Sequence, residues 1–189
     1  MSSKINVFNI IGSHFISLFK GQSFIYICID FFTFVGLPAL LAFISALFKL
    51  EINNDVISLA VNFGAIFTAL LLSVLVLVYE QESKLRDKIS SYKERCKDTE
   101  PNLDYSYIDP NVNIKLKFMG QLYVNISYCI ITSILLVACS AIALVFMNVS
   151  CLSVWNVIIL NPTIVFLLSH ILITILMVVK RIHSLLVIR

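Results

Sequence analysis

The hydrophobic and polar positions of the chain separate into four long apolar blocks and one charged stretch. Each block holds at most one charged residue and the roughly 20 residues that a helix needs to cross a bilayer core. The blocks are Phe24 to Phe48, Val56 to Tyr79, Leu122 to Met147 and Val157 to Val179. The pattern predicts an all-α membrane protein whose four transmembrane helices form two hairpins.

The composition agrees with a membrane protein, because 59% of the residues are hydrophobic and the mean hydropathy is +0.95. Such values exclude an ordinary soluble globule. The changes in pattern divide the chain into five segments. They are an interfacial amphipathic segment (1–22), a first transmembrane hairpin (23–79), a charged cytoplasmic segment (80–117), a second hairpin (118–179) and a cytoplasmic tail (180–189).

The positive charges predict the orientation. Of the 14 Lys and Arg residues, 13 lie before the first span, between the second and third, or after the fourth, and only Lys49 lies on the other side. The positive-inside rule therefore places both termini and the charged segment in the cytoplasm.

The segment Lys4 to Lys20 has its polar residues at helical spacing. We expect a helix in the membrane interface, with its apolar face entering the headgroup boundary. The alternative is that this segment simply extends the first span into the cytoplasm.

Two ionisable residues fall inside predicted spans, and such residues are functional candidates. Asp30 lies about 9 Å from the cytoplasmic end of span one, and His170 lies near the middle of span four. The structural alternatives are that Asp30 caps a helix or pairs with a lysine such as Lys20, and that His170 hydrogen-bonds a serine or a backbone carbonyl. Pro38 is expected to kink span one.

Small residues recur at four-residue spacing in span two, where they allow close helix packing. One row is Ala60, Gly64 and Thr68, and a second is Ala65, Ala69 and Ser73. The pattern leaves open whether these rows meet span one or another subunit.

Past Tyr79 the helix is expected to continue out of the membrane as far as Thr99, because Pro101 disfavours a helix before it. Glu82 and Arg86 have the spacing of a favourable ion pair, and the apolar stripe beside them, which includes Leu85, Ile89 and Tyr92, is typical of a contact surface.

After this helix the period changes. Apolar residues alternate with polar ones over 103–107 and again over 112–118, on either side of Asp109-Pro110-Asn111, which predicts a small β-hairpin. The alternative is an extended linker followed by an early start of span three. Span four has its own alternative, since Asn161-Pro162 is a possible helix start that would leave 155–160 as a dip into the outer leaflet.

No catalytic signature appears in the chain, which holds no H-E-x-x-H, G-x-S-x-G or glycine-rich phosphate loop. We therefore expect no enzyme activity, no catalytic residues, no cofactor and no metal site. The charged segment holds eight positive and eight negative residues, which favours a protein partner over direct nucleic-acid binding. The candidate partner-binding residues are Leu85, Ile89, Tyr92, Arg95, Tyr105 and Tyr107.

Two functions fit these features. The first is a membrane-anchored sensor or scaffold whose cytoplasmic segment recruits a partner, with lipids around its spans. The alternative is a small oligomeric ion channel or pore gated through that segment, with polar residues such as Asn62, Asn125 and His170 lining the pore.

The length, the four spans with both termini inside and the single cytoplasmic segment between spans two and three resemble the KwaA family, the membrane subunits of bacterial Kiwa anti-phage systems. The resemblance covers the whole chain as a layout and includes no diagnostic motif. It implies a homo-oligomer in the bacterial inner membrane that scaffolds a cytoplasmic DNA-binding effector and responds to phage infection. It assigns no functional residue.

Overall fold

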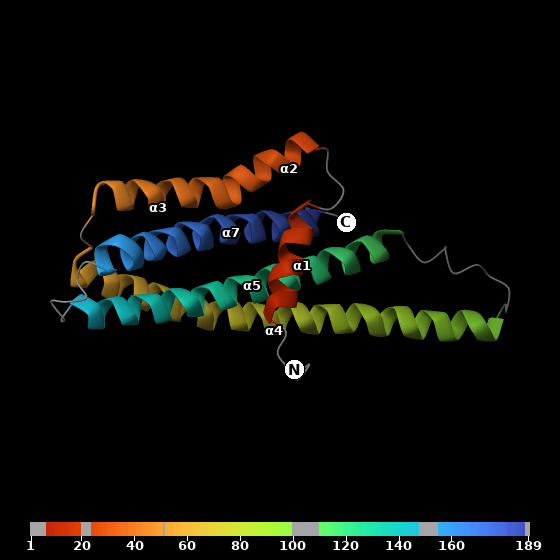
Figure 1. Cartoon of the computed structure of the whole chain (residues 1–189). Helices are drawn as coiled ribbons and strands as arrows, with labels where there is room; N and C mark the ends of the chain where they lie inside the picture. The colour runs from red at the N-terminus through yellow and green to blue at the C-terminus, as the bar shows by residue number, and fades with distance from the viewer. Residues whose placement is uncertain (1–6, 20–23, 51, 100–109, 148–154, 188–189) are drawn as a thin grey trace.

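The computed structural model describes residues 7–19, 24–50, 52–99, 110–147 and 155–187, and these residues are almost entirely helical and contain no strand (Figure 1). The helices are α1 (Val7–Phe19), α2 (Phe24–Phe31), η1 (Phe32–Gly36), α3 (Leu37–Leu47), α4 (Asn54–Thr99), α5 (Pro110–Met147), η3 (Asn156–Leu160) and α7 (Asn161–Val187). The segments η1 and η3 are π-helical turns.

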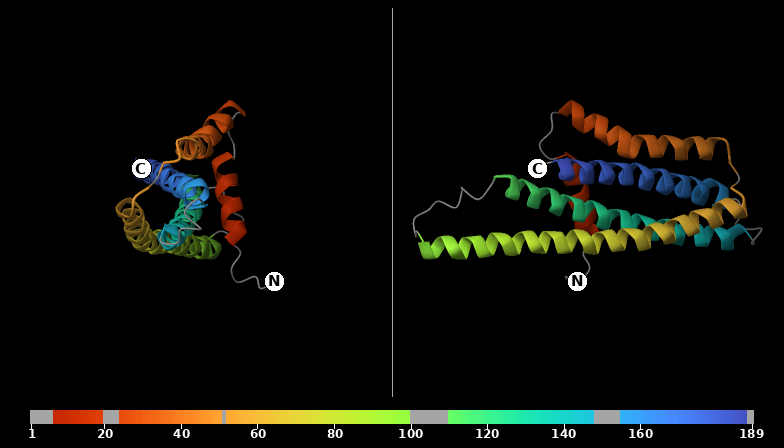
Figure 2. Two further views of the ribbon diagram at one scale, coloured as in Figure 1. Left: turned by 60° about the vertical axis from the view of Figure 1, so that its left-hand side comes forward. Right: turned by 180° about the vertical axis from the view of Figure 1, so that it is seen from behind.

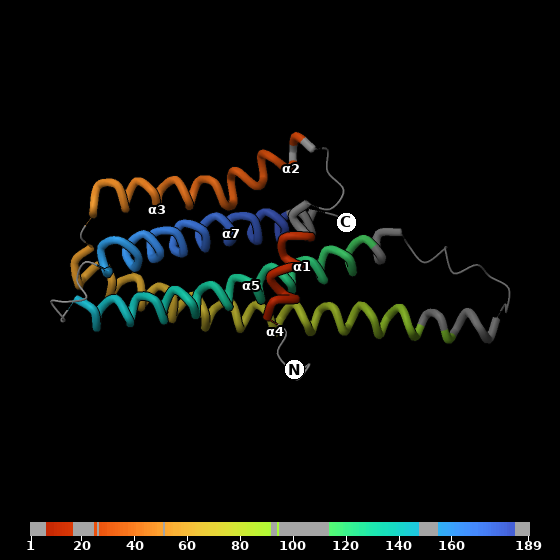
Figure 3. Tube along the Cα trace, viewed as in Figure 1, coloured from red at the N-terminus to blue at the C-terminus, as the bar shows by residue number. Residues whose placement is uncertain are grey.

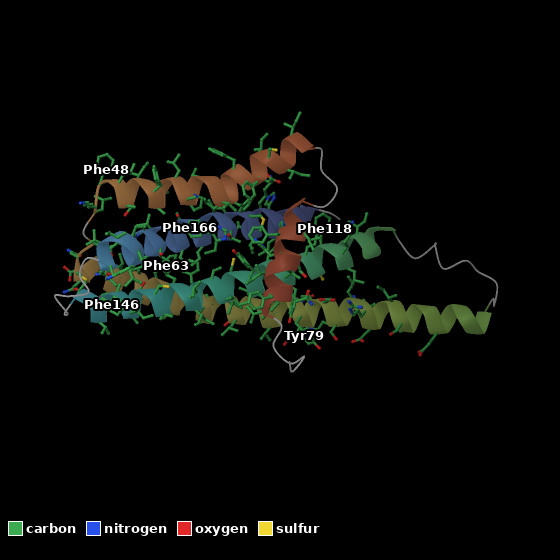
Figure 4. The ribbon with its side chains drawn as sticks, viewed as in Figure 1. Phe48, Phe63, Tyr79, Phe118, Phe146 and Phe166 are labelled. Carbon is green, nitrogen blue, oxygen red and sulfur yellow. The ribbon has the colours of Figure 1, made fainter. Side chains whose placement is uncertain are left out.

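Four helical stretches are long and apolar enough to cross a membrane. They are Ile27–Leu47, Asn54–Ser91, Ile114–Met147 and Asn156–His183. Large apolar side chains are exposed along them, including Phe43, Leu59 and Leu176, which are more than 60% exposed. Tyr79, labelled in Figure 4, is likewise 64% exposed. These features confirm the predicted all-α class, with four helices long and apolar enough to span a membrane.

The order of packing differs from the order along the chain. Helix α3 packs along α7, α7 packs along α5, and α5 packs along α4, so that α7 lies between the first span and the rest of the bundle (Figures 1 and 2). Among the described residues, α3 and α4 therefore do not pack along one another although the connection between them is short, and the predicted first hairpin over 23–79 is not confirmed. The physical reason lies in the partners: α5 fits the small residues of α4, and α7 offers hydrogen-bond donors to the backbone of span one.

The short connection carries the chain from α3 across the start of α7 to α4 (Figure 3). Helix α3 ends in a Schellman motif, in which the Leu50 N–H donates to the Ser45 carbonyl (3.1 Å) and Lys49 takes a left-handed conformation with a φ of 47°. The Leu50 carbonyl then accepts a hydrogen bond from the Asn161 side chain (3.1 Å). Asn53 caps α4 by accepting a hydrogen bond from the Val56 N–H (2.9 Å). We call the end of the bundle at this connection the distal end.

Each of the two π-helical turns ends two residues before a proline. The turn η1 precedes Leu37-Pro38, and η3 precedes Asn161-Pro162. A proline ring clashes with the carbonyl four residues earlier in a regular helix, and a widened turn relieves that clash. The expected distortion at Pro38 is therefore a π-turn. Residues 155–160 are helical and lead directly into α7, so the predicted alternative of a dip over those residues is wrong.

The predicted β-hairpin is contradicted over its second half, because residues 112–118 form the first turns of α5. The first half, 103–107, lies outside the described residues. A lone hairpin is marginal in water, whereas each residue added to an existing helix gains a hydrogen bond without a new nucleation step. Pro110 suits the first helical position, so the early start of the third span is the correct alternative.

Helix α4 runs without interruption for 46 residues, so the predicted helical continuation past Tyr79 is confirmed. The predicted ion pair between Glu82 and Arg86 also forms, with a distance of 2.7 Å between Oε1 and Nη2. This part of α4 lies at the end opposite the distal end, where it first runs beside the first turns of α5, and only its last turns extend beyond them (Figures 1 and 2). We call it the charged end.

Candidate functional site

Polar groups from four helical segments meet inside the bundle. They are His14 of α1, the Phe34 carbonyl of η1, Asn125 and Tyr128 of α5, and His170 of α7. We call this set the polar cluster. Its four side chains are buried, and those of His14 and Asn125 are completely inaccessible to solvent. A polar cluster of this size in an apolar bundle makes it the candidate functional site.

The availability of the Phe34 carbonyl follows from the sequence. In a regular helix this carbonyl accepts a hydrogen bond from the N–H of residue 38, but Pro38 has no N–H. The His170 ring supplies the missing donor, with 2.8 Å between Nδ1 and the Phe34 oxygen. Span four thus completes the backbone hydrogen bonding of span one.

This contact also sets the tautomer of His170. A carbonyl only accepts, so Nδ1 carries the hydrogen and Nε2 is left as an acceptor. The Tyr128 hydroxyl donates to this Nε2 at 2.8 Å. Both ring nitrogens are therefore used, and His170 is a neutral side chain that links α5 to η1. Its contact with a backbone carbonyl is one of the structural alternatives that the sequence suggests.

His14 holds α1 against the bundle. Its ring stacks on that of Tyr128, with centroids 3.9 Å apart and an interplanar angle of 6°, and its Nδ1–H donates to the Asn125 Oδ1 (2.8 Å). Two buried atoms of this pair, the His14 Nε2 and the Asn125 Nδ2, have no hydrogen-bond partner within the described part of the chain. Burial lowers the pKa of His14 from 6.5 to about 4, because the charged imidazolium is poorly solvated there.

This shift predicts that acid releases α1. A detached His14 takes up a proton near its ordinary pKa of 6.5, whereas the docked His14 does so only near 4, so docking weakens as the pH falls through that window. The positive charge of Arg181 opposes the imidazolium further. Amide hydrogen exchange of α1, corrected for the intrinsic effect of pH, should therefore rise between pH 7 and pH 4.5.

A His14→Phe variant provides the control, because phenylalanine keeps an aromatic ring for stacking but does not titrate. Its α1 exchange should be the same at both pH values after correction. Equal protection of the wild-type α1 at pH 7 and pH 4.5 would contradict the docked geometry of His14.

Figure 1 shows α1 lying across the other helices rather than in line with α2, so α1 is not a straight extension of span one. Its buried face is centred on His14, while Phe8 is 84% exposed. The exposed Phe8 is available to the surrounding membrane, as an interfacial helix requires.

Asp30 lies on α2, the helix that follows α1 in the chain, and is half-buried. It interacts electrostatically with Arg181, near the end of α7. The structural alternative for Asp30 was a pairing with a lysine such as Lys20. Among the described residues, Asp30 interacts with Arg181 instead, and Lys20 lies outside the described residues.

The helix-packing residues of span two lie against span three. Ala60 and Gly64 are buried, and a Cβ added at Gly64 would lie 2.7 Å from the Val137 Cγ2 and 3.3 Å from the Ser133 carbonyl oxygen. Thr68 is half-buried and donates to the Gly64 carbonyl (2.7 Å). The partner of this first row is therefore α5 of the same chain, a possibility that the sequence pattern did not include.

The predicted partner-binding residues lie apart from the polar cluster. Leu85 and Ile89 lie on α4 toward the charged end, and both are half-buried. Tyr92 and Arg95 belong to α4, but their side chains lie outside the described residues, as do Tyr105 and Tyr107 altogether. Within the described residues, no group of three or more His, Cys, Asp or Glu side chains is placed to hold a metal ion.

Sequence reasoning missed His14 and Tyr128 as members of a site. Two signals were available: Pro38 marks Phe34 as a residue with a free carbonyl, and His14 falls three residues after Ile11 on the apolar arc of α1. Neither signal identifies the partner, because the partners are 111 and 136 residues away.

The polar cluster joins helices that are far apart in the sequence. His170 and Tyr128 are each engaged by a neighbour, and the cluster connects α1, the first span, α5 and α7. Comparison of the chain with protein-family models, with curated proteins and with solved structures finds no match.

Proposed function

We propose that the protein is an oligomeric sensor and scaffold of the bacterial inner membrane that recruits a cytoplasmic effector in anti-phage defence. The uninterrupted length of α4 is the observation that carries the recruiting role. Its 46 residues correspond to about 69 Å of helix, more than twice the roughly 30 Å of a bilayer core. The part of α4 that exceeds the bilayer thickness forms a rigid, charged helical arm outside the membrane.

The composition of the arm suits protein recognition. Leu85 and Ile89 lie one helical turn apart, and the Glu82–Arg86 ion pair lies beside them. An apolar stripe between charged residues is typical of a helix that packs against another protein. The positive charges of 80–117 support placing this arm in the cytoplasm.

The polar cluster suits the sensing role. Helix α1 lies across the bundle and contacts it through His14, and the same cluster reaches the π-turn of span one through Tyr128 and His170. A change at the membrane surface that moves α1 therefore acts on side chains that hold span one in place. The layout resemblance to the KwaA family supports the anti-phage context.

The second row of small residues in span two supports oligomerisation. Ala65, Ala69 and Ser73 are exposed on α4, whereas Ala60 and Gly64 are buried against α5. In lipid, a face of small side chains allows a second helix to approach closely. A second copy of the chain is the partner we propose for this face.

Photo-crosslinking tests the recruiting role. A photoreactive amino acid at position 89 of the full-length protein, in its native membrane, should capture one discrete cytoplasmic protein. Position 87 is the matched control, because Asp87 lies at the same height on the opposite side of α4 and is exposed. Capture of only lipid or of the chain itself at position 89, or equal capture at both positions, would argue against an effector-binding arm.

A further inference from the structure

Three side-chain oxygens at the distal end are buried and have no hydrogen-bond partner among the residues that the structure describes. They are Ser45 Oγ on α3, Asn156 Oδ1 at the start of η3 and Asn161 Oδ1 at the start of α7. These residues are 2%, 3% and 1% exposed. None belongs to the polar cluster, and none has a role in the proposed function.

Backbone and side-chain hydrogen bonds bring the three residues together. The Ser45 carbonyl accepts from the Leu50 N–H, the Leu50 carbonyl accepts from the Asn161 Nδ2, and the Asn161 N–H donates to the Asn156 carbonyl. The π-turn also brings Asn156 and Asn161 together. A π-helix has more residues per turn than an α-helix, so residues five apart lie closer to the same side of the helix.

The antiparallel register of α3 and α7 gives the same placement. The hydrogen bond from His170 to Phe34 fixes the two helices opposite one another. Toward the distal end, residue 45 lies eleven residues after Phe34 and residue 159 lies eleven residues before His170. Residues 45 and 159 are therefore opposite one another, and residue 159 lies between Asn156 and Asn161. Ser45 is buried, and its helix contacts both α7 and η3, which agrees with a position of Ser45 beside this turn.

The donor and acceptor roles define what the site takes. Asn161 uses its Nδ2 on the Leu50 carbonyl, so its Oδ1 is an acceptor, as is the Asn156 Oδ1, whereas the Ser45 hydroxyl can donate. The matching ligand has two donors and one acceptor, and a water molecule has this pattern and commonly makes about three such bonds. No carboxylate is among the three groups, so they supply no negative charge to balance a metal cation.

We propose that Ser45, Asn156 and Asn161 form a binding site for a structural water molecule at the contact between span one and the η3 turn. This water completes the hydrogen bonding of the distal end, as His170 completes that of the Phe34 carbonyl just before α3 begins. Helix α3 is then joined to α7 by polar contacts near both of its own ends.

Magic-angle-spinning NMR of the full-length protein in lipid bilayers tests the site. With asparagine labelled by ¹⁵N, magnetisation transfer from water to the Asn161 side-chain amide should be several-fold faster than transfer to the backbone N–H of Ala143, labelled in a second sample, which lies in the apolar core. Equally slow transfer at both positions would overturn the proposal. A shift of the Asn161 or Asn156 signals when sodium replaces choline at constant ionic strength would also overturn it, in favour of a cation.

A Ser45→Ala variant separates the hydroxyl from the amides. It should slow the water transfer to Asn161, while the backbone signals of α3 and α7 keep their wild-type positions. Unchanged transfer in this variant would show that Ser45 is not one of the three ligands. The wild-type measurement does not depend on whether the variant folds.

Discussion

Replacement of Gly64 by leucine should lower the free energy of unfolding of the bundle by about 3 kcal/mol or more. Even a single methyl group at this position would lie 2.7 Å from the Val137 Cγ2 and 3.3 Å from the Ser133 carbonyl oxygen, and the much larger leucine side chain forces α4 and α5 apart. That separation removes dispersion contacts along the closest helix pair, and such contacts are what hold helices together in lipid. Thermal unfolding in nanodiscs measures the loss.

An Ala69→Leu variant is the matched control, because it adds a similar side chain to the same helix on a face that is exposed within one chain. Its stability should stay within about 0.5 kcal/mol of the wild type in a monomeric preparation. A Gly64→Ala variant should regain stability when Val137→Ala removes the obstructing methyl groups. Equal destabilisation by Gly64→Leu and Ala69→Leu would contradict the close contact of α4 and α5.

Replacement of His170 by alanine should cost about 2–3 kcal/mol of stability. The change deprives both the Phe34 carbonyl and the Tyr128 hydroxyl of a hydrogen-bond partner inside the bundle, and it leaves a void between α7 and η1. The loss should be measured by unfolding in nanodiscs, together with the protection of α3 from hydrogen exchange, because α3 packs mainly on α7.

A second substitution shows whether the backbone contact carries this cost. Pro38→Ala restores an N–H that can bond to the Phe34 carbonyl within the helix, so the carbonyl no longer depends on His170. In the Pro38→Ala background, His170→Ala should therefore cost about 1 kcal/mol less than in the wild type. Strict additivity of the two changes would mean that His170 stabilises the bundle without the Phe34 carbonyl.

The sequence predicts the spans and the long fourth helix well because both depend on local properties. Four apolar blocks satisfy the length requirement of the bilayer, and the Glu82–Arg86 pair depends only on spacing along one helix. The second row and the first row of small residues in span two look alike in the sequence, however. Only the structure shows that Gly64 packs on α5 while Ala69 is exposed.

The remaining features could not be predicted because they depend on which helices become neighbours. The short connection after α3 suggested a hairpin with α4, but connection length limits distance at one end and does not choose a packing partner. The alternation over 112–118 is compatible with a strand as well as with a helix. These residues are helical because they adjoin the rest of α5. The polar cluster joins His14 to Asn125 across 111 residues, and no local pattern spans that distance.

The attachment of span one to α7 has a consequence for how this protein can vary. His170 and Asn161 both bind backbone carbonyls of the first span and its cap, not side chains. Any residue supplies a carbonyl, so substitutions on the lipid-facing surface of α3 leave both attachments intact, provided that Pro38 keeps the Phe34 carbonyl free. Residues on the outer surface of α3 can therefore be substituted to suit different lipids without a change in the position of α3 in the bundle.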